Sequence, residues 1–301
     1  MAYDIPALVG PDGWATWETL TARVDPHTLA SWVGSGLLRR IQPGVYALPA
    51  AAGDRRTRVE AAVEACRGMA SHRTALALWG LLPPGGPVHL TVDIRRSGRG
   101  TPGVVLHRTR ELADPLRRMD GLPVTCVERA LVDTWGRPDG VRRSDLRAAA
   151  ITAVRRRLCS PRQVLAEIER RPCLPGRASL VTLVGLLADG CQSELEIWGC
   201  LQVLRAPGMP AFVQQRRVIA GGRAWHLDAA YDEVLLAVEM DGAAYHGSRE
   251  QREQDIRRDA LLATVGWQTL RFGYRSLTGD PAGCRREIRA VHDARLRLFR
   301  R

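Results

Sequence analysis

An apolar stretch that carries carboxylates at alternate positions lies in the last third of the chain, in VLLAVEMDG at residues 234–242. An apolar run of this length is typical of a strand buried in a sheet. Glu239 and Asp241 are two residues apart, so their side chains leave such a strand on the same face. Carboxylates are rarely buried unless they are paired or bind a metal. The stretch therefore predicts either an edge strand facing solvent or a strand that holds a cation, and its apolar flanks favour the cation.

A third carboxylate, Asp228, lies in the preceding strand-like stretch AWHLDAAYD, which a tight connection near Asp232 joins to the first. If the two strands are antiparallel neighbours, Asp228 reaches the same end of the sheet as Glu239 and Asp241. Converging carboxylates repel one another, and a divalent cation with hard oxygen ligands relieves this repulsion. Mg²⁺ or Mn²⁺ held in this way activates water against a phosphodiester. We therefore expect Asp228, Glu239 and Asp241 to be metal ligands and catalytic residues.

Further polar residues flank this group. Glu196 is either a metal ligand or positioning residue, or the glutamate of a helix capping box, since Ser193 precedes it by three residues. His246 follows a turn and is either a surface histidine or a proton-transfer residue. Arg258 and Arg271 either pair with the acidic row or contact phosphate, and we expect a structural ion pair for Arg271.

The length and the order of patterns indicate several domains, since 301 residues exceed one ordinary core. Residues 189–301 show the order helix, strand, strand, helix, strand, helix, which is typical of a small nuclease-like core. We expect a winged helix-turn-helix over residues 1–50, a mixed domain over 51–188 with strands at 87–94 and 103–109, and a nuclease-like α/β core over 189–301. The predicted fold class is α/β, in its α+β form.

The first domain shows two helix patterns followed by a basic hairpin. Asp25 precedes Pro26 at the start of the second helix, a common N-terminal signature, and a turn dipeptide at residues 43–44 divides two short strands. This order favours DNA contact through the helix at 26–34 and through Arg39 and Arg40 in the hairpin. A protein-interaction domain of the same fold is the alternative.

Charge points to the same partner, because the chain has a net charge of +12 and a pI of about 10.3. A strongly basic protein most often binds nucleic acid and less often an anionic membrane surface. The sequence shows no apolar run of spanning length and no leader-like start, and its 7 cysteines form no C-x-x-C pair, so we expect a cytoplasmic protein without a disulfide framework. All of the basic residues counted in the Lys+Arg total are arginines, which excludes a catalytic lysine.

The stretches LDAAYDEVLLAVEMDGAAYH and DIRRDALLATVGWQTLRF resemble the very-short-patch-repair branch of the PD-(D/E)xK nuclease superfamily. The resemblance covers about the last third of the chain. It implies a metal-dependent DNA endonuclease whose site includes Asp228, Glu239, Asp241 and His246. The superfamily lysine is replaced by Asp241, as is typical of this branch, in which a histidine takes a catalytic part. Members of the branch also carry a zinc site, for which we find no Cys/His cluster.

Residues 1–188 resemble AbiEi-type antitoxin and abortive-infection regulators more loosely, through GLLRRIQPGVYALP, ASHRTALALWGL and GLPVTCVERALVDT. This resemblance implies a DNA-binding module in a phage-defence or toxin–antitoxin setting, with a cognate toxin or defence protein as a partner. Three functions stay open from the sequence: a DNA endonuclease, an inactive regulator that only binds DNA, and a nuclease that acts on RNA.

Overall fold

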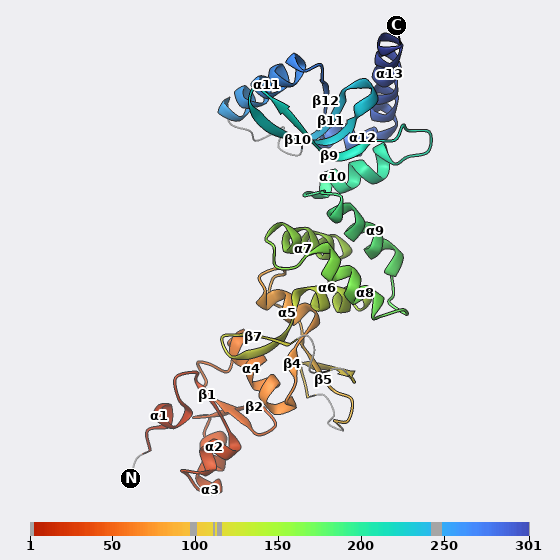
Figure 1. The fold of residues 1–301 in the computed structure, drawn as a ribbon. Helices are drawn as coiled ribbons and strands as arrows, with labels where there is room; N and C mark the ends of the chain where they lie inside the picture. The colour runs from red at the N-terminus through yellow and green to blue at the C-terminus, as the bar shows by residue number, and fades with distance from the viewer. Residues whose placement is uncertain (1–2, 97–100, 111, 113–115, 242–248, 301) are drawn as a thin grey trace. The chain divides into compact units, whose positions relative to one another are not determined.

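A computed structural model describes residues 3–96, 101–110, 112, 116–241 and 249–300 (Figure 1). The chain divides into two compact units, Met1–Arg177 and Ala178–Arg301, and each is described by itself. The domain boundaries expected at residues 50 and 188 stay predictions. Within the described part of the chain, every helix is too short or too polar to span a lipid bilayer.

The first unit begins with a small three-stranded sheet and short helices. Its elements are α1 (Ile5–Val9), β1 (Trp14–Thr16), α2 (Trp17–Thr21), α3 (Pro26–Gly34), β2 (Arg39–Gln42) and β3 (Val45–Ala47). The strands lie in the order β1-β3-β2. The Asp25 side chain accepts hydrogen bonds from the backbone N–H groups of His27 and Thr28, which starts α3 as the sequence predicted. Leu20, Leu29 and other apolar side chains form the core beneath.

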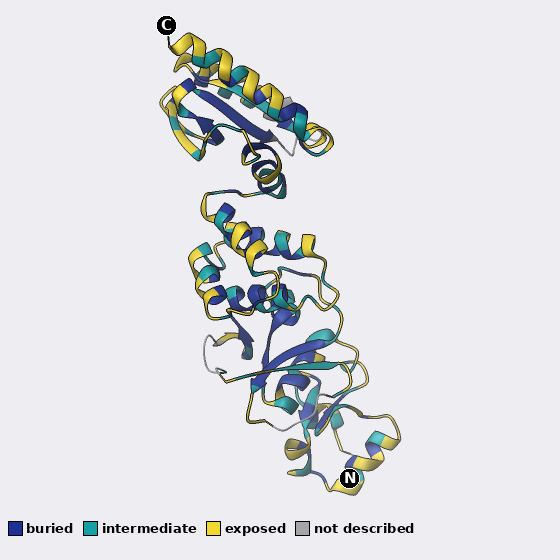
Figure 2. Cartoon of the chain, turned by 90° about the vertical axis from the view of Figure 1, so that its right-hand side faces the viewer, coloured by how far each residue is buried: buried dark blue, intermediate teal, exposed yellow. Residues whose placement is uncertain are grey.

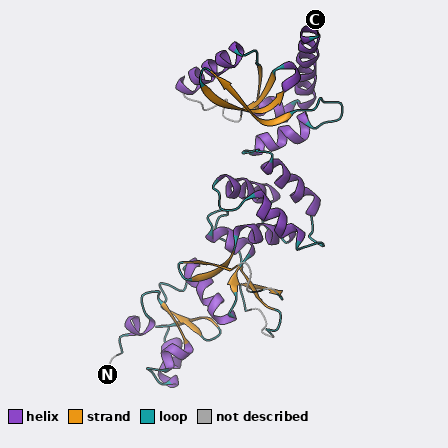
Figure 3. Ribbon diagram, viewed as in Figure 1, coloured by secondary structure: helices purple, strands orange, loops and turns teal. Residues whose placement is uncertain are grey.

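A five-stranded sheet and a group of helices make up the rest of the first unit (Figure 3). The elements are α4 (Arg55–Cys66), β4 (Met69–Ala70), α5 (His72–Leu78), β5 (Val88–Asp93), β6 (Val104–Thr109), β7 (Leu116–Met119), β8 (Leu122–Thr125), α6 (Val127–Gly136), α7 (Arg143–Arg155) and α8 (Pro161–Glu169). The strand order is β6-β5-β4-β8-β7, and β5 and β6 are parallel neighbours. The strands predicted at 87–94 and 103–109 are confirmed.

The second unit is built on a four-stranded sheet in the order β12-β11-β10-β9. Its elements are α9 (Arg177–Ala188), α10 (Glu194–Gly199), the π-helical turn η1 (Cys200–Leu204), β9 (Val213–Ala220), β10 (Arg223–Tyr231), the 3₁₀ turn η2 (Asp232–Val234), β11 (Leu236–Asp241), α11 (Arg249–Thr264), β12 (Gln268–Gly273), α12 (Tyr274–Gly279) and α13 (Pro281–Phe299). Strands β10 and β11 are antiparallel and β11 and β12 are parallel. The predicted α+β fold class is confirmed.

Strand β9 was not predicted from the sequence. Most of its residues are exposed or only partly buried, without a regular alternation, and they include the polar run QQRR, so it gives no clear apolar signal. The neighbouring pair Gly221 and Gly222 has positive φ angles of 58° and 75° and turns the chain from β9 into β10. A two-glycine turn between strands is a hairpin signature, and it was the available signal for β9.

Both faces of β11 are covered. Val238 and Met240 are 1% and 6% exposed, and Glu239 between them is only 4% exposed. Dark blue, which marks buried residues, runs along strands of the sheet in this unit (Figure 2). On the Glu239 side, Ala237 belongs to an apolar cluster with Leu262 of α11. A carboxylate that is buried in this way requires a partner.

Candidate active site

The strand register brings Asp228 and Glu239 together. Ala229 of β10 is paired with Val238 of β11, so one further antiparallel step places Asp228 opposite Glu239. Residues opposite each other in an antiparallel pair share a face of the sheet. The Asp228 carboxylate also reaches β11 directly, because its Oδ2 accepts a hydrogen bond of 2.9 Å from the Met240 backbone N–H. The two carboxylates therefore lie on one face at the end of the paired region.

Arginine from α11 meets the buried glutamate. Arg258 Nη2 donates to Glu239 Oε1 at 2.7 Å and to the His226 carbonyl oxygen, also at 2.7 Å. The Arg258 side chain is only 17% exposed, so this ion pair is largely shielded from water. The guanidinium supplies one positive charge to a site that holds two carboxylates.

Burial makes both carboxylates hard to ionise, and the charge of Asp228 adds to this effect at Glu239. Burial, followed by the negative charge of Asp228, raises the pKa of Glu239 to about 8, although Arg258 and Arg271 act in the opposite direction. Burial also raises the pKa of Asp228, against the hydrogen bond from the Met240 N–H. Two close carboxylates whose charge is incompletely balanced form a donor set that suits a hard divalent cation. Asp228 and Glu239 therefore fit the expected Mg²⁺ or Mn²⁺.

Glu239 is expected to make the metal-free protein less stable as the pH rises. The folded pKa of about 8 lies above the ordinary value of 4.5, so the folded state keeps a proton that the unfolded chain releases. This contribution to stability is present in full below about pH 4.5 and is lost as the pH rises through about 8. Melts in EDTA should show a larger fall of Tm across this window for the wild type than for Glu239→Gln. Glu287→Gln, an exposed control on α13, should follow the wild type. If Tm falls equally with pH in the wild type and in Glu239→Gln, the pKa of Glu239 is not raised by burial in the folded protein.

Glu196 lies at the start of α10, in the capping arrangement that the sequence offered as one alternative. Its backbone N–H donates to Ser193 Oγ at 3.1 Å, Ser193 Oγ donates to Glu196 Oε1 at 2.8 Å, and the Gln192 N–H donates to Glu196 Oε2 at 2.8 Å. Burial, and more weakly the charge of Asp228, raises its pKa. Both carboxylate oxygens are thus engaged in the cap, and a part for Glu196 in the site stays a prediction.

Two predicted site residues fall at the edge of what the structure describes. The backbone of Asp241 ends β11, where it is paired with Gly273 of β12, but its side chain is outside the described residues, and so is the whole of His246. Arg271 pairs with Asp259 through two hydrogen bonds of 3.0 and 2.8 Å, the structural ion pair that the sequence predicted. This bidentate contact ties β12 to α11 beside Glu239.

A groove of about 630 Å³ opens beside Arg258, between the start of β10 and α11. It is lined by Gly221, Arg223, Trp225, Gln254, Asp255, Arg257, Arg258 and Leu261. The guanidinium groups of Arg223 and Arg258 lie 4.8 and 5.7 Å from the centre of the Trp225 ring. Basic side chains around an aromatic ring suit a nucleic-acid strand, because phosphates pair with the cations and bases stack on the ring.

Comparison with known families places a nuclease model on this region. A family model described as REase_MTES_1575 matches residues 212–291, which contain β9 to β12, α11 and the Asp228–Glu239 pair. The C-terminal region contains a restriction-endonuclease-like domain. The presence of such a domain supports a hydrolase activity of the nuclease type, with DNA as the substrate.

Comparisons with curated proteins and with solved structures add little to the family match. No curated protein matches the sequence. A crystal structure of the Rv2827c protein from Mycobacterium tuberculosis is similar at a TM-score of 0.43 and 19% sequence identity, over 63% of this chain and 74% of that chain.

Within the restriction-endonuclease-like domain, Gln215 lies beside the carboxylates, and the sequence did not predict this. Gln215 Nε2 in β9 lies 3.4 Å from Asp228 Oδ1, and Gln215 has a positive φ of 49°. A non-glycine residue in this conformation is uncommon and marks a local irregularity in the strand. Because β9 itself was missed, no pattern drew attention to Gln215.

Proposed function

We propose that the protein is a Mg²⁺- or Mn²⁺-dependent DNA endonuclease with an N-terminal DNA-binding module. The shared placement of the Asp228 and Glu239 carboxylates on one face of the sheet carries this proposal. These two residues would hold the cation, with Asp241 as a third ligand. The bound cation would polarise the scissile phosphate and lower the pKa of the attacking water.

The chain's own residues prepare this site in three ways. Asp228 is oriented by the Met240 N–H, so its carboxylate stays directed toward β11. Arg258 balances the charge of Glu239 from α11, while the groove beside it offers Arg223 and Arg257 to the DNA backbone. His246 would move a proton at the attacking water or the leaving group, and Glu196 would position ligands from α10.

The edge strand β2 of the β2–β3 hairpin supports the proposal of a DNA-binding module. Arg39 and Arg40 are both exposed on β2, which pairs antiparallel with β3, and α3 precedes this hairpin. In a winged helix-turn-helix, such a hairpin contacts phosphates while the second helix lies in the major groove. The AbiEi-like patterns add the proposal of a cytoplasmic defence or toxin–antitoxin role with a cognate toxin or defence protein as a partner.

Replacement of both hairpin arginines by alanine should weaken DNA binding without changing sequence preference. Each lost phosphate contact lowers the slope of log affinity against log salt by about 0.9, so the double variant should lose about 2 units. The matched control is the double replacement of Arg95 and Arg162 by alanine, since these two exposed arginines lie in the same unit. If both double variants show the wild-type slope, β2–β3 is not a DNA-contacting wing.

Plasmid nicking tests the enzymatic proposal directly. Purified full-length protein should convert supercoiled DNA to the nicked or linear form with Mg²⁺ or Mn²⁺ and should be inactive in EDTA. The competing function is an antitoxin-type regulator that binds DNA without cleaving it. Retained DNA affinity with no cleavage under any divalent ion would favour that regulator. Cleavage of single-stranded RNA in preference to DNA would instead identify an RNA-directed nuclease.

A further inference from the structure

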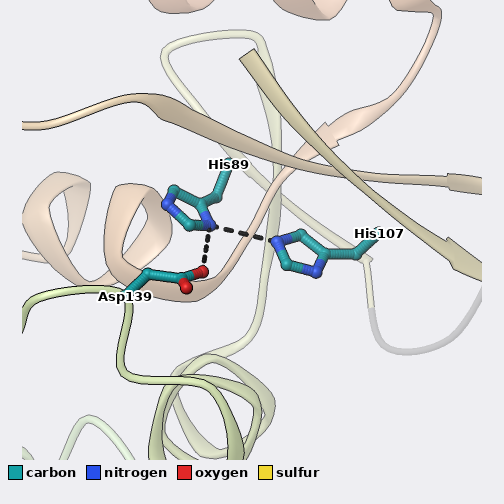
Figure 4. A group of neighbouring side chains, drawn as sticks. All are labelled: His89, His107 and Asp139. Carbon is teal, nitrogen blue, oxygen red and sulfur yellow. Dashed lines mark hydrogen bonds and ion pairs between the residues drawn. The ribbon is translucent and has the colours of Figure 1, made fainter. Parts of the chain in front are cut away.

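Histidines and an aspartate meet in the first unit, in a part of the protein that the proposed nuclease site does not use (Figure 4). His89 comes from β5, His107 from β6, and Asp139 from the connection between α6 and α7. The parallel register pairs Thr91 with His107, and His89 shares its face with Thr91 because the two are two residues apart. Both imidazoles therefore leave the sheet on the same side.

The distances within this group suit coordination of one ion. His89 Nδ1 lies 3.0 Å from His107 Nε2 and 3.6 Å from Asp139 Oδ2, and the candidate donor atoms all lie within 4.8 Å of one another. Zinc bonds to nitrogen and oxygen are about 2.0–2.2 Å long, so neighbouring ligands of one ion are separated by roughly 3.0–3.5 Å. Only a small adjustment of the side chains would be needed.

The protonation states also suit a ligand role. Burial is the main cause that lowers the pKa of both His89 and His107 to about 4. Both rings are therefore neutral near pH 7, which is the form in which imidazole binds metals. Neutral imidazole is a ligand for Zn²⁺, Fe²⁺, Ni²⁺ and Cu²⁺, whereas the all-carboxylate pair in the second unit suits Mg²⁺ or Mn²⁺.

Neighbouring residues hold the group in place. The His72 ring stacks on the His107 ring with centroids 3.5 Å apart, and His72 Nδ1 lies 3.0 Å from Ser71 Oγ. His72 has a φ of 51°, a left-handed conformation that is costly for a non-glycine residue and that is concentrated at functional sites. Arg137 Nε lies 3.7 Å from Asp139 Oδ2, but its side chain is 63% exposed and is free to turn toward solvent.

We propose that His89, His107 and Asp139 bind one divalent transition-metal ion of the Zn²⁺ class. Three protein ligands leave at least one coordination position for water or a substrate group, as in catalytic zinc sites. His72 would be a positioning residue that fixes the orientation of the His107 ring. The site is distinct in residues and in ligand chemistry from the carboxylate pair of the restriction-endonuclease-like domain.

Zn²⁺ titration of the chelator-treated full-length protein tests this proposal. Calorimetry is done on the Glu239→Gln background, which weakens the other candidate metal site, and Co²⁺ absorption in the visible range reports nitrogen ligation. We expect one Zn²⁺ per chain, and binding weaker by at least about 10- to 100-fold in both Asp139→Asn and His107→Gln, because loss of a residue that only orients a ligand already costs this much. His27→Gln, a change at an exposed histidine on α3, should bind as the parent does.

The two variants guard against a trivial loss of folding. Asp139 is 34% exposed, and its φ of 44° is tolerated by asparagine as well as by aspartate, so Asp139→Asn should keep the parent Tm in the absence of metal. Absence of Zn²⁺ binding in the folded parent would overturn the proposal, and so would undiminished affinity in Asp139→Asn and His107→Gln. Neither outcome bears on the nuclease proposal, which plasmid nicking tests separately.

Discussion

Asp228→Asn is expected to reduce Mg²⁺-dependent DNA cleavage by about 10³-fold or more, a loss of about 4 kcal/mol in transition-state stabilisation. The variant removes one charged oxygen ligand and keeps the size of the side chain. DNA affinity should stay equal or rise slightly, because one negative charge near the phosphate path is gone. Single-turnover cleavage and a DNA-binding titration in Ca²⁺ measure the two quantities on the same preparation.

The matched control is Asp293→Asn, which removes an exposed carboxylate from α13 in the same unit. It should cleave DNA at the wild-type rate. Should Asp228→Asn also cleave at that rate, Asp228 would have no place among the metal ligands. A joint loss of cleavage and DNA affinity in Asp228→Asn would point to a damaged fold, and a thermal melt would detect this.

Arg258→Ala is expected to destabilise the metal-free protein strongly at alkaline pH. Removal of one partner from a buried ion pair typically costs about 3–5 kcal/mol, because the remaining charge is left buried and unpaired. Glu239 escapes this cost at lower pH by taking up a proton, since burial already raises its pKa to about 8. Denaturant unfolding in EDTA should therefore show a large loss near pH 9 and a much smaller loss near pH 6.

Two further variants isolate the contribution of the Arg258–Glu239 ion pair to stability. Arg257→Ala removes an exposed arginine one position away on α11 and should change stability by less than about 0.5 kcal/mol. On the Glu239→Gln background, Arg258→Ala should cost much less than in the wild type, because no buried charge is left behind. Equal costs on the two backgrounds would show that the contact between Arg258 and Glu239 contributes no net stability.

Local sequence patterns predicted much of the secondary structure of the second unit. Apolar runs, the tight connection near Asp232 and the order of strand and helix patterns predicted β10, β11, α11 and β12, because each of these elements is encoded within a short window. The neighbouring placement of Asp228 and Glu239 followed from that order, since strands joined by a tight connection pair antiparallel. Their role as metal ligands stays a prediction.

Contacts between distant segments could not be derived in the same way. The sequence left open whether Arg258 pairs with the acidic row or contacts phosphate, and only the packing of α11 against the sheet brings it to Glu239. Strand β9 lies at the edge of its sheet and has too little apolar character to be read. His89 and His107 meet because β5 and β6 are parallel neighbours, and Asp139 reaches them from the connection between α6 and α7. No spacing motif could reveal such a group.

Mn²⁺ binding to the full-length protein tests the central claim most directly, namely that Asp228 and Glu239 share one divalent cation. Electron paramagnetic resonance measures free Mn²⁺, and the titration is done on the His107→Gln background so that the histidine group contributes little. We expect one Mn²⁺ per chain, with affinity at least about tenfold lower in Asp228→Asn and in Glu239→Gln, and with Glu287→Gln unchanged. Binding of Mn²⁺ with equal affinity in all four proteins, or no binding at all, would contradict the claim.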